Sequence, residues 1–177
     1  MVGHESSGGP TPGMVIRAAA ADDLDELVDL AVQTHDYHVA GDPDTFEPIA
    51  DIAAKRAHFG GWLRDDAATV LVAVVDDRPI GYAVLRKEVT PPVPGVRQRG
   101  FGRVEDIGVD RDHRRMGIGR RLMDEALTWA RAAGLEAVEL NVFEFNSAAI
   151  TLYESLGYRT VNRRMRLDLK GDEDSPT

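Results

Sequence analysis

A glycine-rich turn between an apolar run and an amphipathic helix constrains this chain more than any other segment. The turn Arg114-Arg115-Met116-Gly117-Ile118-Gly119-Arg120 follows the apolar run 104–109 and opens a helical pattern over 118–133. The first turn of a helix has backbone N–H groups without an intrahelical partner, and the helix macrodipole adds partial positive charge there. Gly117 and Gly119 remove side chains that would keep a phosphate away from these groups. Because arginines also surround the turn, it predicts a site that binds a pyrophosphate.

Two familiar phosphate motifs are excluded by residues that this turn lacks. A nucleoside-triphosphatase loop requires Gly-x-x-x-x-Gly-Lys-Ser/Thr, and no Lys follows the glycines here. A dinucleotide-binding fingerprint requires a third glycine three residues after the second, where this chain has Leu122. The pattern that remains is Arg114-x-x-Gly117-x-Gly119.

Length and composition limit the class of protein. The 177 residues fit one domain with a substantial core, and the formal net charge of −9 disfavours a nucleic-acid-binding protein. No apolar run approaches the ~20 residues that span a bilayer, and the first 13 residues lack the features of a signal peptide. The chain has no cysteine, which excludes a disulfide framework, a thiolate metal site and a Cys nucleophile. We therefore expect a cytoplasmic protein that binds neither nucleic acid nor membrane.

The alternation of helical and strand patterns predicts a mixed α/β sheet. The expected order is β-α-α-β-β-β-α-β-α-β-β, and a long proline-containing loop occupies 89–102. We expect a single domain over 14–169, a disordered lead over 1–13 and an acidic tail over 170–177. Strands are expected at 14–18, 69–75, 80–86, 104–109, 137–143, 158–161 and 164–169, and helices from 24, at about 49–63, at 118–133 and at 147–156.

Three separated motifs of this chain resemble the GCN5-related N-acetyltransferase (GNAT) family. The turn Arg114-x-x-Gly117-x-Gly119 is similar to the family's coenzyme A pyrophosphate loop, Gln/Arg-x-x-Gly-x-Gly/Ala. The strand Glu105-Asp106-Ile107-Gly108-Val109 directly precedes it. The third motif matches the helix that lines the far side of coenzyme A, through Asn146, Tyr153, Gly157 and Tyr158. The resemblance covers residues 16 to about 169 and implies the acetyltransferase fold, with an α/β sheet that is mostly antiparallel and flanked by helices.

The resemblance implies acetyl-CoA as cosubstrate, held in the V between the strands 104–109 and 137–143. The pyrophosphate would lie on the glycine turn, and the pantetheine arm would pair with the strand backbone like an added strand. Asn146 could bond the coenzyme or cap the helix that follows, and both roles can hold because they use different groups. The implied coenzyme-binding residues are Ile107, Gly108, Val109, Arg114, Arg115, Met116, Gly117, Ile118, Gly119, Arg120 and Asn146.

Two residues are the candidates for catalysis. Tyr153 fits either a core aromatic or a general acid by its spacing, and the resemblance favours the acid, because a phenol with a pKa of about 10 can protonate the leaving thiolate. Glu105 is the candidate base, and its alternative role is an ion pair with Arg103 or Arg99. Strand alternation places Asp106 on the side of the strand opposite to Glu105, and we expect it to be a structural or substrate-orienting carboxylate.

The acceptor site is expected beside the first helix. His35 and His38 stand three residues apart and could share a metal, but no third ligand is evident nearby, so no metal site is predicted. The segment 38–44 would instead form one wall of the acceptor site, which makes both histidines candidate substrate-binding residues. The loop 89–102 would form the opposite wall, where Arg97 and Arg99 would meet an acidic group of the acceptor or lie in solvent.

We expect an acetyl-CoA-dependent N-acetyltransferase that acts by direct transfer in a ternary complex, since no Cys is available to form an acetyl-enzyme. The acceptor would be a primary amine on a cationic small molecule, with a protein amino terminus or lysine as the alternative. A non-catalytic acetyl-CoA sensor is the rival from another class, and a dinucleotide-binding oxidoreductase is a distant third. A homodimer is implied by analogy with the family alone.

Overall fold

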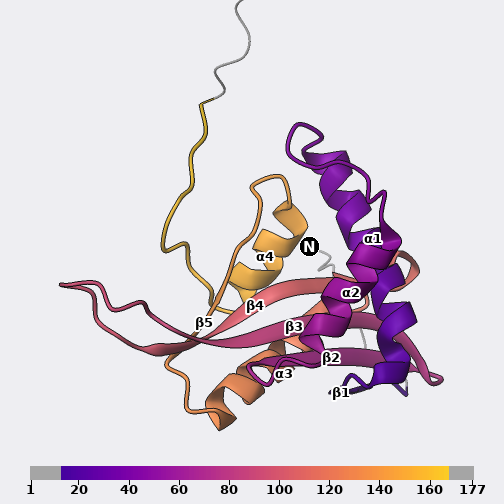
Figure 1. Ribbon diagram of the computed structural model, residues 1–177, viewed down its shortest axis with the longest axis horizontal. Coiled ribbons are helices and arrows are strands. Elements are labelled where there is room, and N and C mark those ends of the chain that lie inside the picture. The colour runs from indigo at the N-terminus through magenta and orange to yellow at the C-terminus, as the bar shows by residue number, and fades with distance from the viewer. Residues whose placement is uncertain (1–12, 168–177) are drawn as a thin grey trace, which may run out of the picture.

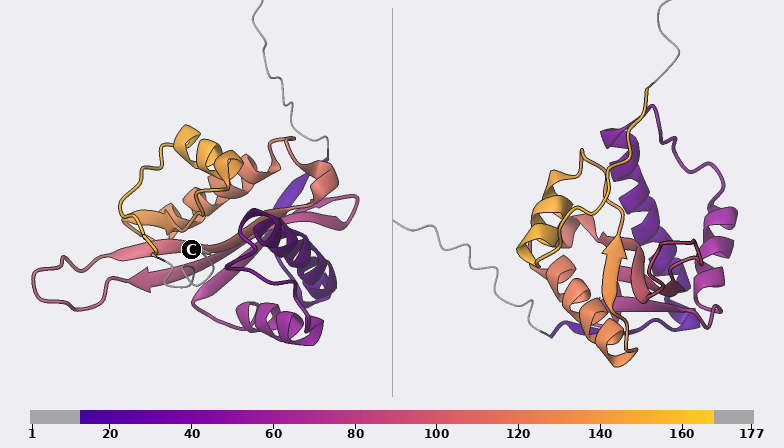
Figure 2. Two further views of the ribbon diagram at one scale, coloured as in Figure 1. Left: turned by 90° about the horizontal axis from the view of Figure 1, so that it is seen from above. Right: turned by 90° about the vertical axis from the view of Figure 1, so that its left-hand side faces the viewer.

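The computed structural model describes residues 13–167 as a five-stranded mixed sheet with helices on both faces (Figures 1 and 2). This architecture confirms the predicted α/β class. The lead at 1–12 and the tail at 170–177 lie outside the described residues. The elements in chain order are β1 (Val15–Ala18), α1 (Leu24–Gly41), α2 (Ile52–Trp62), β2 (Ala68–Val75), β3 (Arg78–Val89), β4 (Gly100–Val109), α3 (Ile118–Ala132), β5 (Ala137–Leu140) and α4 (Ser147–Ser155), with short 3-10 turns at Ala21–Asp23 and Arg111–His113.

The strand order in space follows the order in the chain, β1-β2-β3-β4-β5. The first four strands are antiparallel to their neighbours, and β5 is parallel to β4 because α3 crosses between them. The β2–β3 turn is shorter than the four residues expected: only Asp76 and Asp77 lie outside the strands, with φ of 49° and 62°. Positive φ at both central residues is typical of a type I′ turn, whose twist suits a hairpin.

The sheet separates two apolar cores. One lies under α1 and α2 and the other under α3 and α4, on opposite sides in Figure 2. Residues 80–85 of β3 are all buried, and residues 82–85 supply the two cores alternately, as expected for a central strand covered on two faces. The fully buried side chains of the two cores include Leu27, Phe59, Val72, Tyr82, Leu85, Ile118, Leu122 and Met123.

The strands predicted for the C-terminal part of the chain are wrong. The segment 137–143 forms a strand only to Leu140, and residues 158–167, which were expected to contribute two strands, form none. This segment instead runs past α4, and Arg166 donates a 2.7 Å hydrogen bond to the Thr45 hydroxyl (Figure 1, yellow). Val161 and Met165 are largely exposed. A strand needs a neighbouring backbone to pair with, so β-forming residue types do not make one by themselves.

The β3–β4 hairpin is longer than predicted and projects beyond the helices (Figure 1). Its strands extend to Val89 and back from Gly100, so the expected loop 89–102 is reduced to residues 90–99. Within residues 13–167, no helix is both long and apolar enough to cross a bilayer.

Candidate active site

A β-bulge in β4 creates the centre of the site. Val84 of β3 pairs with Asp106, but the next residue, Leu85, pairs with Val104, so Glu105 is the extra residue in the ladder. An extra residue interrupts strict alternation and re-aims the side chains next to it. Glu105 and Asp106 both line one cavity. Their carboxylates have different charged and polar neighbours, so their expected placement on opposite sides of the strand stays a prediction.

The two central strands part beside this bulge. The last β4–β5 pair joins Val104 to Leu140, whereas β4 continues to Val109. On the side that β5 has left, residues 105–109 pair with no strand in the described part of the chain. Their backbone N–H and C=O groups on that side can accept an extended ligand as an added strand. Ile107 and Val109, the predicted pantetheine contacts, lie on this stretch.

A cavity of about 200 Å³ opens where the strands part. It is lined by α1, the middle of β4, the segment that follows β5, and α4. Its charged groups are the two carboxylates of the bulge, and none of the described residues that line it is Lys or Arg. The lining residues are Thr34, Tyr37, His38, Val104, Glu105, Asp106, Ile107, Leu140, Asn141, Val142, Phe143, Asn146 and Tyr153.

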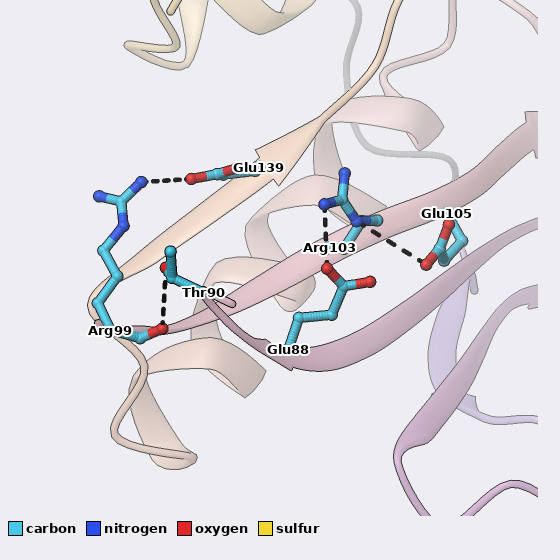
Figure 3. Close-up of polar contacts among 6 residues, drawn as sticks. All are labelled: Glu88, Thr90, Arg99, Arg103, Glu105 and Glu139. Carbon is cyan, nitrogen blue, oxygen red and sulfur yellow. Dashed lines mark hydrogen bonds and ion pairs between the residues drawn. The ribbon is translucent and has the colours of Figure 1, made fainter. Parts of the chain in front are cut away.

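The carboxylate of Glu105 is held loosely. Its oxygen lies 4.0 Å from Arg103 Nε, whereas Arg103 Nη2 donates a 3.0 Å hydrogen bond to Glu88 (Figure 3). Arg99, the other candidate partner, bonds Glu139 instead (Figure 3). Burial raises the pKa of Glu105, and the positive charge of Arg103 only partly opposes this. With 25% of its side chain exposed, Glu105 is suited to accept a proton from a ligand or a water.

Tyr153 belongs both to the core and to the cavity. It extends from α4, is 7% exposed and packs among the apolar residues under α3 and α4, with the Tyr158 ring centroid 5.9 Å away. It also lines the cavity with Glu105. Burial raises the pKa of Tyr153 to about 12, so the phenol keeps its proton at neutral pH. A buried, protonated phenol at the cavity is what a general acid requires.

The glycine turn has the geometry of an anion site, but its two glycines differ in role. Gly117 is the N-cap of α3 with φ of 79°, a value that disfavours residues with a Cβ, and a Cβ there would meet no atom within 4 Å. Its outer face is therefore open to a ligand. A Cβ on Gly119 would lie 3.3 Å from Leu152 Cδ2 of α4. Gly119 thus permits α3 and α4 to pack closely, a role the sequence reasoning missed.

The arginines of the turn point in different directions. Arg114 Nε donates to the Val109 carbonyl at 3.2 Å, and its guanidinium lies 5.7 Å from the centroid of the Tyr37 ring. Arg120 donates to the Ser155 hydroxyl of α4. Arg115 has φ of 66°, and both it and Met116 are exposed at the turn. Ile118 is buried in the core, so only its backbone N–H can face a ligand.

Two further predicted coenzyme residues have structural roles. Asn146 Oδ1 accepts a 3.2 Å hydrogen bond from Ala149 N, which confirms the N-cap role, and Asn146 also lines the cavity. Gly108 is buried beneath α1. A Cβ at this position would overlap Thr34 Oγ1 and lie 2.6 Å from Tyr82 Cε1, so a glycine is needed for α1 to approach β4.

The two histidines have different surroundings. His38 lines the cavity, and burial lowers its pKa. His35 does not line it; its Nε2 lies 2.7 Å from the Glu47 carbonyl oxygen. Within residues 13–167, no group of three or more His, Cys, Asp or Glu side chains is arranged to hold a metal ion.

The opposite wall of the cavity is not the loop that was expected. None of the described lining residues belongs to 89–102, and Arg97 lies 3.3 Å from Glu136, far along the hairpin. Residues 140–143 form that wall, because the chain leaves the sheet after Leu140 and turns across the gap. Phe143 was not predicted as a site residue, and the available signal was its spacing from Phe145, which lies just beyond the predicted strand 137–143.

The sequence profile described as the Acetyltransferase (GNAT) family matches residues 25–158, which run from the second residue of α1 past the end of α4 and include all residues that line the cavity. The chain therefore belongs to this family.

Solved structures and sequence relatives agree with this assignment. A mutant of the BH1408 protein from Bacillus halodurans is 31% identical with a TM-score of 0.81, over 88% of this chain and 99% of that one. An aminoglycoside N-acetyltransferase in complex with CoA shares the fold at 19% identity and a TM-score of 0.70, over 89% and 95% of the two chains.

An uncharacterized N-acetyltransferase of Methanocaldococcus jannaschii is 27% identical over 81% of this chain, which spans 59% of that relative's length. The ribosomal protein bS18-alanine N-acetyltransferase of Escherichia coli is 38% identical over a segment that makes up 40% of this chain and 49% of that relative's length.

Proposed function

We propose that this protein is an acetyl-CoA-dependent N-acetyltransferase that passes the acetyl group directly to a primary amine in a ternary complex. The observation that carries the proposal is a single cavity, at the point where β4 and β5 part, that is lined by both Glu105 and Tyr153. Several relatives that share the fold or part of the sequence are named as N-acetyltransferases, and this supports the same reaction.

The site fits acetyl-CoA as a substrate in two places. The first-turn N–H groups of α3 and the open face of Gly117 suit the pyrophosphate, with Arg114 and Arg115 beside them. The free backbone stretch 105–109 suits the amide-containing pantetheine arm. This path leads the thioester to the cavity.

The residues of the cavity then have distinct roles. Glu105 accepts a proton from the acceptor ammonium, directly or through water, and leaves a neutral amine. The amine nitrogen attacks the thioester carbonyl carbon, a C–N bond forms and the C–S bond breaks. Tyr153 donates its proton to the departing thiolate, and the nitrogen of the new amide loses its remaining excess proton to solvent. Glu105 then releases its proton to solvent, and the Tyr153 phenolate takes one up, which restores both groups. A backbone N–H of the free stretch 105–109 would stabilise the oxyanion.

The acceptor is a cationic small molecule. Two carboxylates and the absence of Lys and Arg among the described lining residues favour a positively charged group in the cavity. A peptide amine is the second candidate, favoured by the 38% identity to the ribosomal protein bS18-alanine N-acetyltransferase over 72 residues. A non-catalytic sensor has no need of a base and a buried phenol at the same cavity.

The test is the release of free thiol from acetyl-CoA against a panel of polyamines, amino acids, an aminoglycoside and short peptides, with calorimetry of acetyl-CoA binding beside it. Turnover with amines supports the transferase and ranks its acceptors. Tight binding without turnover would favour the sensor. A failure to bind acetyl-CoA would overturn the proposal.

A further inference from the structure

Aromatic rings from two distant segments meet at the mouth of the cavity. His38 stacks on Phe46 with ring centroids 5.2 Å apart and an interplanar angle of 29°. Phe143 meets the edge of Phe46 at 5.0 Å and stacks on Phe145 at 5.6 Å. Tyr37 lies 6.1 Å from Phe145. We call these five residues, which join the end of α1 and its following loop to the segment after β5, the aromatic mouth.

The aromatic mouth is part of the wall of the cavity and is open to solvent. Tyr37, His38 and Phe143 line the cavity together with Glu105 and Asp106. Phe143 is 42% exposed. Exposed aromatic rings at the entrance of a cavity that ends in carboxylates form a site that is apolar outside and anionic inside.

Charged groups of both signs lie near the mouth. Arg114 lies over the face of Tyr37 at 5.7 Å, and Arg166 bonds Thr45 next to Phe46. The charge of Lys55 acts on both His38 and Asp106. Burial lowers the pKa of His38, so its imidazole is neutral at neutral pH and adds no further charge. Among the described residues that line the cavity, the only carboxylates are those of Glu105 and Asp106. Acidic residues next to the rings in sequence, such as Glu47 and Glu144, do not line it.

We propose that the acceptor is a monoamine whose single amine lies at Glu105 and Asp106 and whose apolar arm, preferably an aryl group, lies against the aromatic mouth. This inference rests on the proposed acetyltransferase function and narrows its acceptor class. A polyamine or an aminoglycoside carries several ammonium groups and needs an anion near each. Inside the cavity those further charges would face apolar rings and no third carboxylate, whereas an aryl arm gains stacking and apolar burial.

The experiment compares matched acceptors with the full chain at one acetyl-CoA concentration. We expect kcat/KM for 2-phenylethylamine to exceed that for spermidine and for an aminoglycoside by at least about tenfold, because an aromatic pair adds roughly 0.5–1.5 kcal/mol beyond its area burial and each unpaired ammonium adds a penalty. Equal or better turnover of spermidine or the aminoglycoside would overturn the acceptor class and leave the transferase intact.

Variants of Phe143 give a second readout. Phe143→Ala should raise the KM for 2-phenylethylamine about five- to tenfold and leave the KM for acetyl-CoA unchanged. Phe143→Glu should place an anion at the mouth and shift the ratio of kcat/KM values toward spermidine. Val93→Ala, an exposed position on the hairpin loop remote from the cavity, is the matched control and should change neither constant. An unchanged amine KM in Phe143→Ala would overturn the role of the mouth.

The two proposals fail in different ways. If acetyl-CoA binds but neither arylalkylamines nor polyamines react, the acceptor class proposed here is wrong. If acetyl-CoA does not bind, the acetyltransferase function itself fails. Turnover of a peptide amine in preference to every small amine would contradict the proposed monoamine acceptor but agree with the proposed acetyltransferase function.

Discussion

Glu88 of β3 accepts a 3.0 Å hydrogen bond from Arg103 of β4, the strand that also carries the candidate base Glu105. This bond holds the guanidinium toward β3, so that its distance to Glu105 is 4.0 Å (Figure 3). The negative charge of Glu88 raises the pKa of Glu105, and the positive charge of Arg103 lowers it. We propose that Glu88 positions Arg103 and so keeps the candidate base Glu105 from being neutralised by it.

Glu88→Gln should weaken the base. The substitution removes a charge that raises the pKa of Glu105 and releases Arg103 to pair with it, and both effects lower that pKa. The acid limb of the kcat/KM pH profile should therefore move to lower pH, and the plateau should fall roughly threefold. Glu139→Gln is the matched control, because it frees only Arg99. An acid limb that moves to higher pH would contradict this role.

Glu105→Gln should slow the reaction most at low pH, where the acceptor is protonated and needs a base. Burial raises the pKa of Glu105, so the wild-type carboxylate is lost as the pH falls through that raised value and is present above it. The ratio of wild-type to variant kcat/KM should fall as the pH rises from about 6 to about 9, as the amine loses its proton unaided. A constant ratio would assign the base to another group.

Tyr153→Phe should lower kcat by about 10²-fold with little change in acetyl-CoA affinity, because the ring that packs in the core is retained and only the proton donor is lost. Steady-state kinetics and calorimetry measure the two quantities. Tyr158→Phe is the control: its hydroxyl is also buried, but Tyr158 does not line the cavity. Equal rates in the wild type and Tyr153→Phe would remove the acid role.

Gly117→Asp should abolish acetyl-CoA binding, because it places a negative charge on the open face of the turn. Gly117→Asn separates this effect from backbone strain, since Asn tolerates the left-handed conformation and carries no charge. We expect the Asn variant to lose less affinity than the Asp variant in calorimetry. Similar acetyl-CoA affinities of the Gly117→Asp variant and the wild type would show that the pyrophosphate lies elsewhere.

Gly108→Ala should lower the free energy of unfolding by about 1–3 kcal/mol, because the new methyl group overlaps Thr34 and crowds the Tyr82 ring. Denaturant unfolding measures the loss. Gly61→Ala is the control and should not destabilise the protein, because a Cβ at this position in the last turn of α2 meets no atom within 4 Å. An unchanged free energy of unfolding in Gly108→Ala would mean that α1 can shift away from β4 without cost.

The sequence determined what depends on local pattern. The turn 114–120 between a strand and a helix predicted the N-terminus of α3, and the spacing of Asn146 and Tyr153 predicted α4 and its cap. These features were predictable because a helix end needs only nearby residues to complete its hydrogen bonds. The class of fold followed from the same periodicities.

The tertiary structure decided what depends on pairing between distant segments. The bulge at Glu105 exists only in the register of β4 against β3, and it brings Glu105 and Asp106 to one cavity. Residues 158–167 form no strand although their residue types favour one, and Phe46 meets Phe143 across almost a hundred residues. Strand register and side-chain contacts are set by the partner segment as much as by the segment itself, so no local pattern could determine them.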